Sequence, residues 1–159
     1  MAGFRRVRGA LRLYTERTNK GCMREKEMGR GKPAGHCSLK VVVIEDNLVL
    51  RNIIVDALRD MAPVEILFCA DNEISATNWL SSNDSAWDLA VVDLHLRQGS
   101  GVGALSWCTT RRANQRVVVL SGELNDDVRQ KCLALRADAV FDKSSEMNEF
   151  LNYCRSLTV

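Results

Sequence analysis

Five polar residues of the sequence each follow a short apolar run, and their side chains suit one kind of chemistry. They are Glu45, Asp46, Asp93, Ser121 and Lys143. Clustered carboxylates repel one another and tend to take up protons, and a hard divalent cation such as Mg²⁺ removes that repulsion. A carboxylate beside such a cation can attack a phosphoryl group, while an ammonium and a hydroxyl contact the phosphoryl oxygens. These residue types therefore predict Mg²⁺-dependent phosphoryl transfer, provided that the fold brings them together.

The apolar runs before these residues predict strands. Leu89, Ala90, Val91 and Val92 precede Asp93, and a continuous apolar run of this kind is typical of a strand buried on both faces. Because Asp is disfavoured inside strands, Asp93 should mark the carboxyl end of this one. Further runs of this type predict strands over 39–44, 64–68, 116–120 and 137–141.

Amphipathic segments separate the predicted strands. Apolar residues recur at helical spacing over 50–61, 71–80, 102–112, 124–135 and 147–157. The first of these patterns is the strongest, and Pro63 ends it. We expect Asp71 or Asn72 to cap the second helix, and Ser144 or Ser145 to cap the last.

Five strands that alternate with five helices imply right-handed crossovers and a parallel sheet covered on both faces. In a doubly wound sheet the carboxyl ends of the strands form the edge where ligands bind. The five polar residues would then share one shallow site, and Gly122 would leave room beside it. The alternative is a set of unrelated polar residues at strand ends, which their combination at successive strand ends disfavours.

Residues 39 to 157 resemble the response-regulator receiver domain of two-component signalling. The matching pieces, in order, are VVIEDN at 42–47, VVDL at 91–94, GSG at 99–101, VLSG at 119–122 and DK at 142–143. The resemblance implies an α/β, flavodoxin-like fold with a doubly wound five-stranded parallel sheet. It also implies the strand order 2-1-3-4-5 and five helices.

The resemblance assigns a role to each carboxylate. Asp93 would accept a phosphoryl group from a phosphohistidine of a histidine kinase or phosphotransfer protein. Asp46 would bind Mg²⁺ directly and Glu45 through water. The Asp93 carboxylate and the backbone carbonyl of His95 would complete the protein ligands. The His95 side chain would either have no role beyond that of a loop residue or influence the lifetime of the acyl phosphate on Asp93.

The resemblance also implies which residues and which face of the domain would respond to phosphorylation. Ser121 and Lys143 would contact the phosphoryl oxygens beside Gly122, and Ser121 would move inward. The face formed by residues 123–136, 139–141 and 146–157 would then change shape. That face would bind an unknown downstream protein or a second copy of the chain. Such a protein is a signalling switch that catalyses only its own phosphotransfer and dephosphorylation, and not an enzyme in the usual sense.

Three positions depart from the family pattern. Ser144 stands where the family has a proline after a cis peptide bond, so we expect a trans peptide or a shifted Lys143. Val140 stands at the position of the family's switching aromatic residue, and Phe141 should face the other side of the strand. Arg97 replaces a common proline. These departures concern the readout of phosphorylation and not the carboxylates.

Several functions compete. Because no residues follow Val159 for a DNA-binding output domain, a stand-alone receiver would act by protein contact, as a relay step or as a phosphate sink. A degenerate receiver would bind proteins independently of phosphorylation, as Val140 and Ser144 favour. A phosphatase of the haloacid-dehalogenase type needs a second Asp where His95 stands. A nucleic-acid binder would use the basic N-terminal residues.

The charge of the chain divides it in two. Residues 1–39 carry +7 and residues 40–159 carry −5 of the net charge of +2. We interpret 1–38 as a basic, disordered extension and 39–159 as the receiver domain. A basic amphipathic helix that touches a membrane or nucleic acid, a transit peptide and a translation start at Met23 or Met28 are the alternatives.

Cysteine usage and hydropathy indicate the compartment. The six cysteines form no CxxC or similar metal-ligand pair. No apolar run approaches the ~18 residues of a membrane span, and the N-terminus lacks the apolar region of a secretory signal. These features predict a protein of the reducing cytoplasm.

Overall fold

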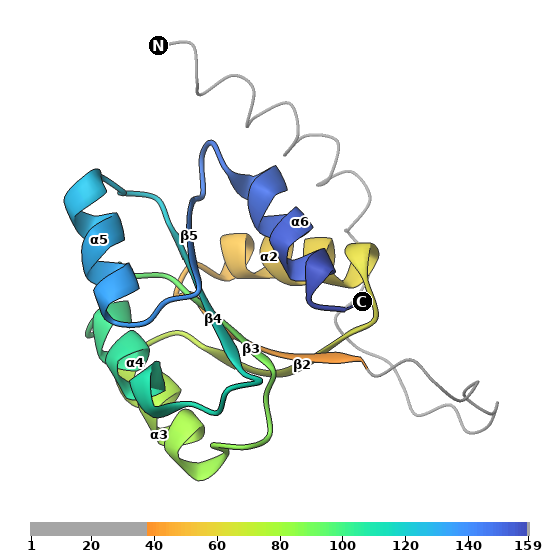
Figure 1. Cartoon of the computed structure of the whole chain (residues 1–159), viewed down its shortest axis with the longest axis horizontal. Helices are drawn as coiled ribbons and strands as arrows, with labels where there is room; N and C mark the ends of the chain where they lie inside the picture. The colour runs from red at the N-terminus through yellow and green to blue at the C-terminus, as the bar shows by residue number, and fades with distance from the viewer. Residues whose placement is uncertain (1–37, 159) are drawn as a thin grey trace, which may run out of the picture. The chain divides into compact units, whose positions relative to one another are not determined.

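Five strands and five α-helices alternate within residues 38–158, which are the residues that the structure, a computed structural model, describes (Figure 1). The strands are β1 (Leu39–Ile44), β2 (Val64–Ala70), β3 (Leu89–Val92), β4 (Arg116–Ser121) and β5 (Ala139–Asp142). The helices are α2 (Leu48–Met61), α3 (Glu73–Ser82), α4 (Gly101–Trp107), α5 (Asp126–Ala134) and α6 (Met147–Ser156). A 3₁₀ turn, η1 (Cys108–Thr110), follows α4. The interpretations of the basic N-terminal segment concern residues 1–37, outside this range.

The strands form one sheet of order β2-β1-β3-β4-β5, and every neighbouring pair is parallel. Ile44 pairs with Val92, so β1 and β3 end at the same level, and β4 continues two residues beyond Val119, the partner of Val92. The predicted flavodoxin-like fold and its strand order are therefore confirmed. The next strand after β1 along the chain lies on one side of it and β3 lies on the other, and ligands bind at this switch between β1 and β3 in sheets of this kind.

Alternate residues of the central strands point into two separate apolar cores. Val42 and Val92 lie in the core covered by α3, α4 and α5. Val43 and Val91 lie in the core covered by α2 and α6. All four side chains are at most 2% exposed. Burial on both faces explains why these strands are continuous apolar runs and do not alternate with polar residues. The two groups of helices lie on opposite sides of the sheet in Figure 1.

Asparagine side chains cap three of the helices, α2, α3 and α5. At α2, Asn47 Oδ1 accepts the backbone N–H of Val49 at 3.1 Å. At α3, Asn72 Oδ1 accepts the N–H of Ser75 at 2.8 Å. Both bonds satisfy amides that have no partner in the first turn of a helix. The cap predicted at Asp71 or Asn72 is therefore supplied by Asn72.

The predicted cap of the last helix is wrong. Helix α6 begins after Glu146, and no side chain caps it. The backbone N–H groups of Ser144 and Ser145 donate to Asp142 Oδ1 at 2.7 and 3.1 Å, and the Ser144 hydroxyl donates to the same oxygen. A short Asp side chain commonly closes a turn two residues ahead, and here this local bond prevails over capping.

Other boundaries also differ from the prediction, and two of them have an identifiable cause or form. The helix predicted over 102–112 is split into α4 and η1, which together end at Thr110. The strand predicted from residue 137 starts at Ala139, because Arg136 ends the preceding helix with a φ of 65° and Ala137 donates its N–H to Cys132 at 3.0 Å. The left-handed residue after a helix is a common way to end it.

Helix length in the described part of the chain also bears on membrane insertion. The longest helix, α2, has 14 residues. No helix between residues 38 and 158 is long and apolar enough to cross a bilayer.

Three of the cysteines fill space in the two cores. Cys108 and Cys132 pack in one core and Cys154 in the other, and all three are free thiols. Burial raises the pKa of both Cys108 and Cys154 to about 12. These cysteines therefore act as small apolar side chains, as their sequence positions suggest.

Gly101 allows α4 to start directly against the end of β3. A Cβ atom on Gly101 would lie 1.7 Å from the backbone oxygen of Asp93. We expect Gly101→Ala to lower the free energy of unfolding by about 2 kcal/mol, because α4 or the strand end must move. Urea denaturation measures this loss. Gly122→Ala is the control, since a Cβ there meets nothing within 4 Å, and an equal loss in both variants would contradict the prediction.

Candidate functional site

The carboxyl ends of the strands are joined by backbone hydrogen bonds. The N–H of Asp93 donates to the carbonyl of Ile44 at 2.9 Å, which connects β3 with β1. The N–H of Lys143 donates to the carbonyl of Ser121 at 3.0 Å, which connects β5 with β4. The side chains of these residues therefore start from neighbouring points along one edge of the sheet.

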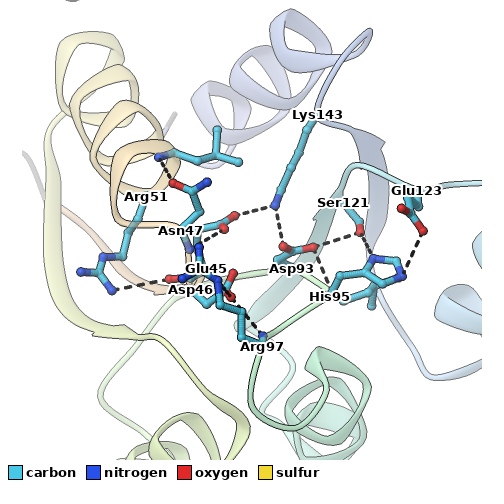
Figure 2. A network of polar contacts seen from close by, with 12 residues as sticks. Glu45, Asp46, Asn47, Arg51, Asp93, His95, Arg97, Ser121, Glu123 and Lys143 are labelled. Atoms are coloured by element: carbon cyan, nitrogen blue, oxygen red, sulfur yellow. Dashed lines mark hydrogen bonds and ion pairs between the residues drawn. The ribbon is translucent and has the colours of Figure 1, made fainter.

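Lys143 lies between two buried carboxylates at this edge. Its ammonium is 2.5 Å from Glu45 Oε2 and 2.6 Å from Asp93 Oδ2 (Figure 2). The Lys143 side chain is 12% exposed, and those of Glu45 and Asp93 are 2% and 7% exposed. The ammonium thus compensates two negative charges that are almost removed from water.

Burial raises the pKa of Glu45, and the Lys143 ammonium offsets part of that effect. The other Glu45 oxygen accepts the N–H of Asn47 at 3.1 Å, so both carboxylate oxygens have donors. A carboxylate held in this way has a fixed orientation.

Asp46 completes a group of three carboxylates. One carboxylate oxygen each of Glu45, Asp46 and Asp93 lies within 4.8 Å of the other two. Arg97 contacts the same group from the loop after β3, since its N–H and Nε lie 3.0 and 3.2 Å from Asp46 Oδ2. Three carboxylate oxygens this close together fit a hard cation such as Mg²⁺, which prefers oxygen ligands and keeps part of its water.

A second chain of contacts runs from Asp93 in the opposite direction. Asp93 Oδ1 accepts the Ser121 hydroxyl at 3.0 Å and the backbone N–H of His95 at 3.2 Å. His95 Nδ1 lies 3.2 Å from Ser121 Oγ, and His95 Nε2 lies 3.8 Å from Glu123 Oε2. Because the single hydroxyl proton of Ser121 is directed at Asp93, His95 Nδ1 is the donor to Ser121 Oγ. Figure 2 shows this chain beside the Lys143 contacts.

The three carboxylates, His95 and Lys143 line an open depression with a volume of about 360 Å³, whereas Ser121 is fully buried and does not line it. It is lined by Glu45, Asp46, Asn47, Leu50, Asp93, His95, Gly122, Glu123 and Lys143. The structure thus brings together the residues that the sequence placed at strand ends. Gly122 leaves space at the wall of this depression, since a Cβ there would contact nothing within 4 Å.

The two residues of β5 before Asp142 face opposite sides of the sheet. The Val140 side chain is buried in the core covered by α5. Phe141 packs against Phe150 and Tyr153 of α6, with ring centroids 6.0 and 5.9 Å apart. The predicted opposite orientation of Phe141 is confirmed, and the side facing α5 has a valine. The peptide bond after Lys143 is trans, as are all peptide bonds of the described residues.

Sequence reasoning missed the charged partners around the site. It assigned no role to Glu123, Arg129 or Glu146, and it noted Arg97 only as a departure from a pattern. These long side chains meet groups up to 51 residues away, as Arg97 meets Asp46. Neither periodicity nor local spacing carries a signal for such contacts.

Comparisons with known proteins bear on the family and the fold. Residues 41–155 match the sequence profile of the response regulator receiver domain. The response regulator domain of CheB from Thermotoga maritima has a TM-score of 0.66 at 17% identity, over 77% of this chain and 97% of that one. A chain of the CheX–CheY–BeF3–Mg complex from Borrelia burgdorferi has a TM-score of 0.68 at 17% identity, over 76% and 90%. The phosphorylated cyanobacterial phytochrome response regulator RcpA has a TM-score of 0.63 at 23% identity, over 76% and 91%. These likenesses show a shared fold.

Proposed function

The chain belongs to the response regulator receiver domain family, and from this premise we propose that Asp93 is its phosphoryl acceptor. The donor would be the phosphohistidine of a histidine kinase or of a phosphotransfer protein. We propose residues 39–159 as the receiver domain, with residues 1–38 outside it. Domains of this family are signalling switches of two-component systems and not enzymes in the usual sense.

The observation that carries the proposal is the position of Lys143 between Glu45 and Asp93. An Asp93 oxygen attacks phosphorus, the P–N bond of the phosphohistidine breaks, and its electron pair leaves with the imidazole. Lys143 then holds a phosphoryl oxygen in place of the Asp93 carboxylate. Ser121, already 3.0 Å from Asp93, donates its hydroxyl to another phosphoryl oxygen. Gly122 leaves the space that the group needs.

Glu45, Asp46 and Asp93, together with the backbone carbonyl of His95, would hold Mg²⁺. The cation would neutralise charge on the phosphoryl oxygens. Neighbouring residues of the chain would orient these ligands, because the backbone N–H of Asn47 bonds Glu45 and the backbone N–H of Arg97 bonds Asp46.

The direct test is to incubate the chain with acetyl phosphate and Mg²⁺ and to follow the intact mass. We expect a gain of one phosphoryl group. No gain would refute the proposal.

Mg²⁺ is expected to stabilise the fold through Asp46. A ligand that binds only the folded chain adds about 2.7 kcal/mol at a free concentration about one hundred times its Kd. Asp46→Asn should lose most of this effect, because it removes a charged oxygen ligand. Thermal unfolding at increasing MgCl₂ measures the difference. Asp127→Asn, which removes an exposed charge of α5, is the control, and equal Mg²⁺ responses in the two variants would contradict the assignment.

We further propose that output runs through protein contacts of the face made by α5, β5 and α6, with a downstream protein or a second copy of the chain as the partner. A phosphorylation-independent binding module is the second candidate function. The buried valine at position 140 favours it, because this side chain has no ring to rotate. Absence of both Mg²⁺ stabilisation and phosphorylation would select this second candidate.

A further inference from the structure

Arg129 connects helix α5 with the end of β5. Its Nη1 donates to the backbone carbonyl of Val140 at 2.7 Å, and its Nη2 donates to Glu146 Oε2 at 2.6 Å. The Arg129 side chain is 31% exposed and that of Glu146 is 35% exposed. One planar guanidinium therefore holds two acceptors that belong to β5 and to the turn after it.

Glu146 extends this connection to the turn that carries Lys143. Its Oε2 atom, which binds Arg129, also accepts the N–H of Asp142 at 2.7 Å. The backbone N–H of Glu146 donates to the Asp142 carbonyl at 2.8 Å. Asp142 Oδ1 in turn accepts the N–H groups of Ser144 and Ser145. The turn from Asp142 to Glu146 is thus closed by its own hydrogen bonds, with Lys143 inside it.

Arg129 links α5 to the turn that carries Lys143, and the side chain of Val140 makes no such link. Val140 is 9% exposed and packs in an apolar core, so its side chain makes no polar contact with the turn. The Arg129 guanidinium also holds the pKa of Glu146 below its usual value, which keeps that carboxylate charged. The contact is therefore a charged, hydrogen-bonded one.

We propose that Arg129 is a positioning residue that couples the Lys143 turn to helix α5 through Glu146 and the Val140 carbonyl. Its use in signalling rests on the proposed function. Lys143 leaves the Asp93 carboxylate when a phosphoryl group arrives, the turn follows its lysine, and Arg129 passes that displacement to α5. The helix then responds to phosphate without an aromatic residue at position 140.

A double-mutant cycle tests the coupling without phosphate. Backbone hydrogen exchange of α5 is measured in the wild-type chain, Lys143→Met, Arg129→Met and the double variant. The readout is restricted to amides of α5 that exchange by local opening, after correction for the global unfolding that the β1 amides report. For these amides we expect Lys143→Met to speed exchange about threefold in the wild-type background and to add nothing after Arg129→Met, as for residues that act through one another. Equal effects of Lys143→Met in both backgrounds would overturn the proposal. Asp93→Asn, which removes one partner of Lys143, replaces Lys143→Met if that variant does not fold.

A second arm adds acetyl phosphate and Mg²⁺ and reads intact mass and exchange on the same samples. At equal phosphate occupancy, the response of α5 in Arg129→Met should be at most about one third of that in the wild type. Lys131→Met removes an exposed charge of the same helix and should respond as the wild type does. An undiminished response of α5 in Arg129→Met would overturn the coupling. An absent mass gain in the wild type would overturn only the proposed function, because the phosphate-free cycle tests the coupling separately.

Discussion

Asp93→Asn is expected to abolish the mass gain that acetyl phosphate and Mg²⁺ produce in the wild-type chain, a loss of at least about a hundredfold in rate. An amide oxygen is a poor nucleophile, and the substitution also removes one of the three charges that would hold Mg²⁺. The fold should survive, because the N–H of residue 93 still bonds the Ile44 carbonyl and Lys143 still has Glu45 as a partner. Intact mass, with peptide mapping of the phosphorylated residue, measures the effect.

Asp126→Asn is the matched control for this experiment. Asp126 is an exposed carboxylate in the first turn of α5, so its loss should leave phosphorylation at the wild-type level. A phosphoryl gain that persists in Asp93→Asn would show that another residue is the acceptor.

Lys143→Met is expected to lower the free energy of unfolding by about 3–5 kcal/mol in Mg²⁺-free buffer. It removes the ammonium from two carboxylates that are 2% and 7% exposed, those of Glu45 and Asp93, and leaves their charges buried side by side. Mg²⁺ should then stabilise the variant more than it stabilises the wild type, because the cation no longer competes with an ammonium for the same oxygens. Chemical denaturation with and without MgCl₂ measures both effects.

Lys131→Met serves as the control for charge loss. Lys131 is exposed on α5, so its substitution should change stability by no more than about 0.5 kcal/mol. If Lys143→Met were as mild as this control, the ammonium would not be compensating the buried carboxylates. If Mg²⁺ stabilised Lys143→Met no more than the wild type, the cation and the lysine would not share these oxygens.

Most of the fold can be predicted from the sequence, because burial leaves a strong pattern. A strand covered on both faces must be apolar at every position, as in Val41, Val42 and Val43, which are all 0% exposed. The period of two within a strand also predicted that Phe141 and Val140 face opposite sides. Helix ends are harder to predict, because several polar residues compete for the same amides. Ser144 donates its N–H and its hydroxyl to Asp142 Oδ1 and does not cap α6.

The backbone of the candidate site can be predicted for the same reason, but its outer contacts cannot. Parallel strands end at one edge, so Glu45, Asp93 and Lys143 meet wherever the strands are correctly placed. The contact of Arg129 with Glu146 depends on the distance between α5 and β5 and on the rotamers of two long side chains. A linear sequence states neither quantity. The roles proposed for Arg129 and Glu146 in the response to phosphorylation could therefore be identified only from the structure.

The backbone hydrogen bonds at the sheet edge determine which substitutions the edge can tolerate. The N–H groups of Glu45, Asp93 and Lys143 bond the carbonyls of Ala70, Ile44 and Ser121. Every residue type except proline can make these bonds. A single substitution such as Asp93→Asn is therefore expected to end the proposed phosphorylation and to keep the sheet edge in place. A chain that has lost the proposed chemistry in this way is therefore expected to keep the face that we propose for partner binding.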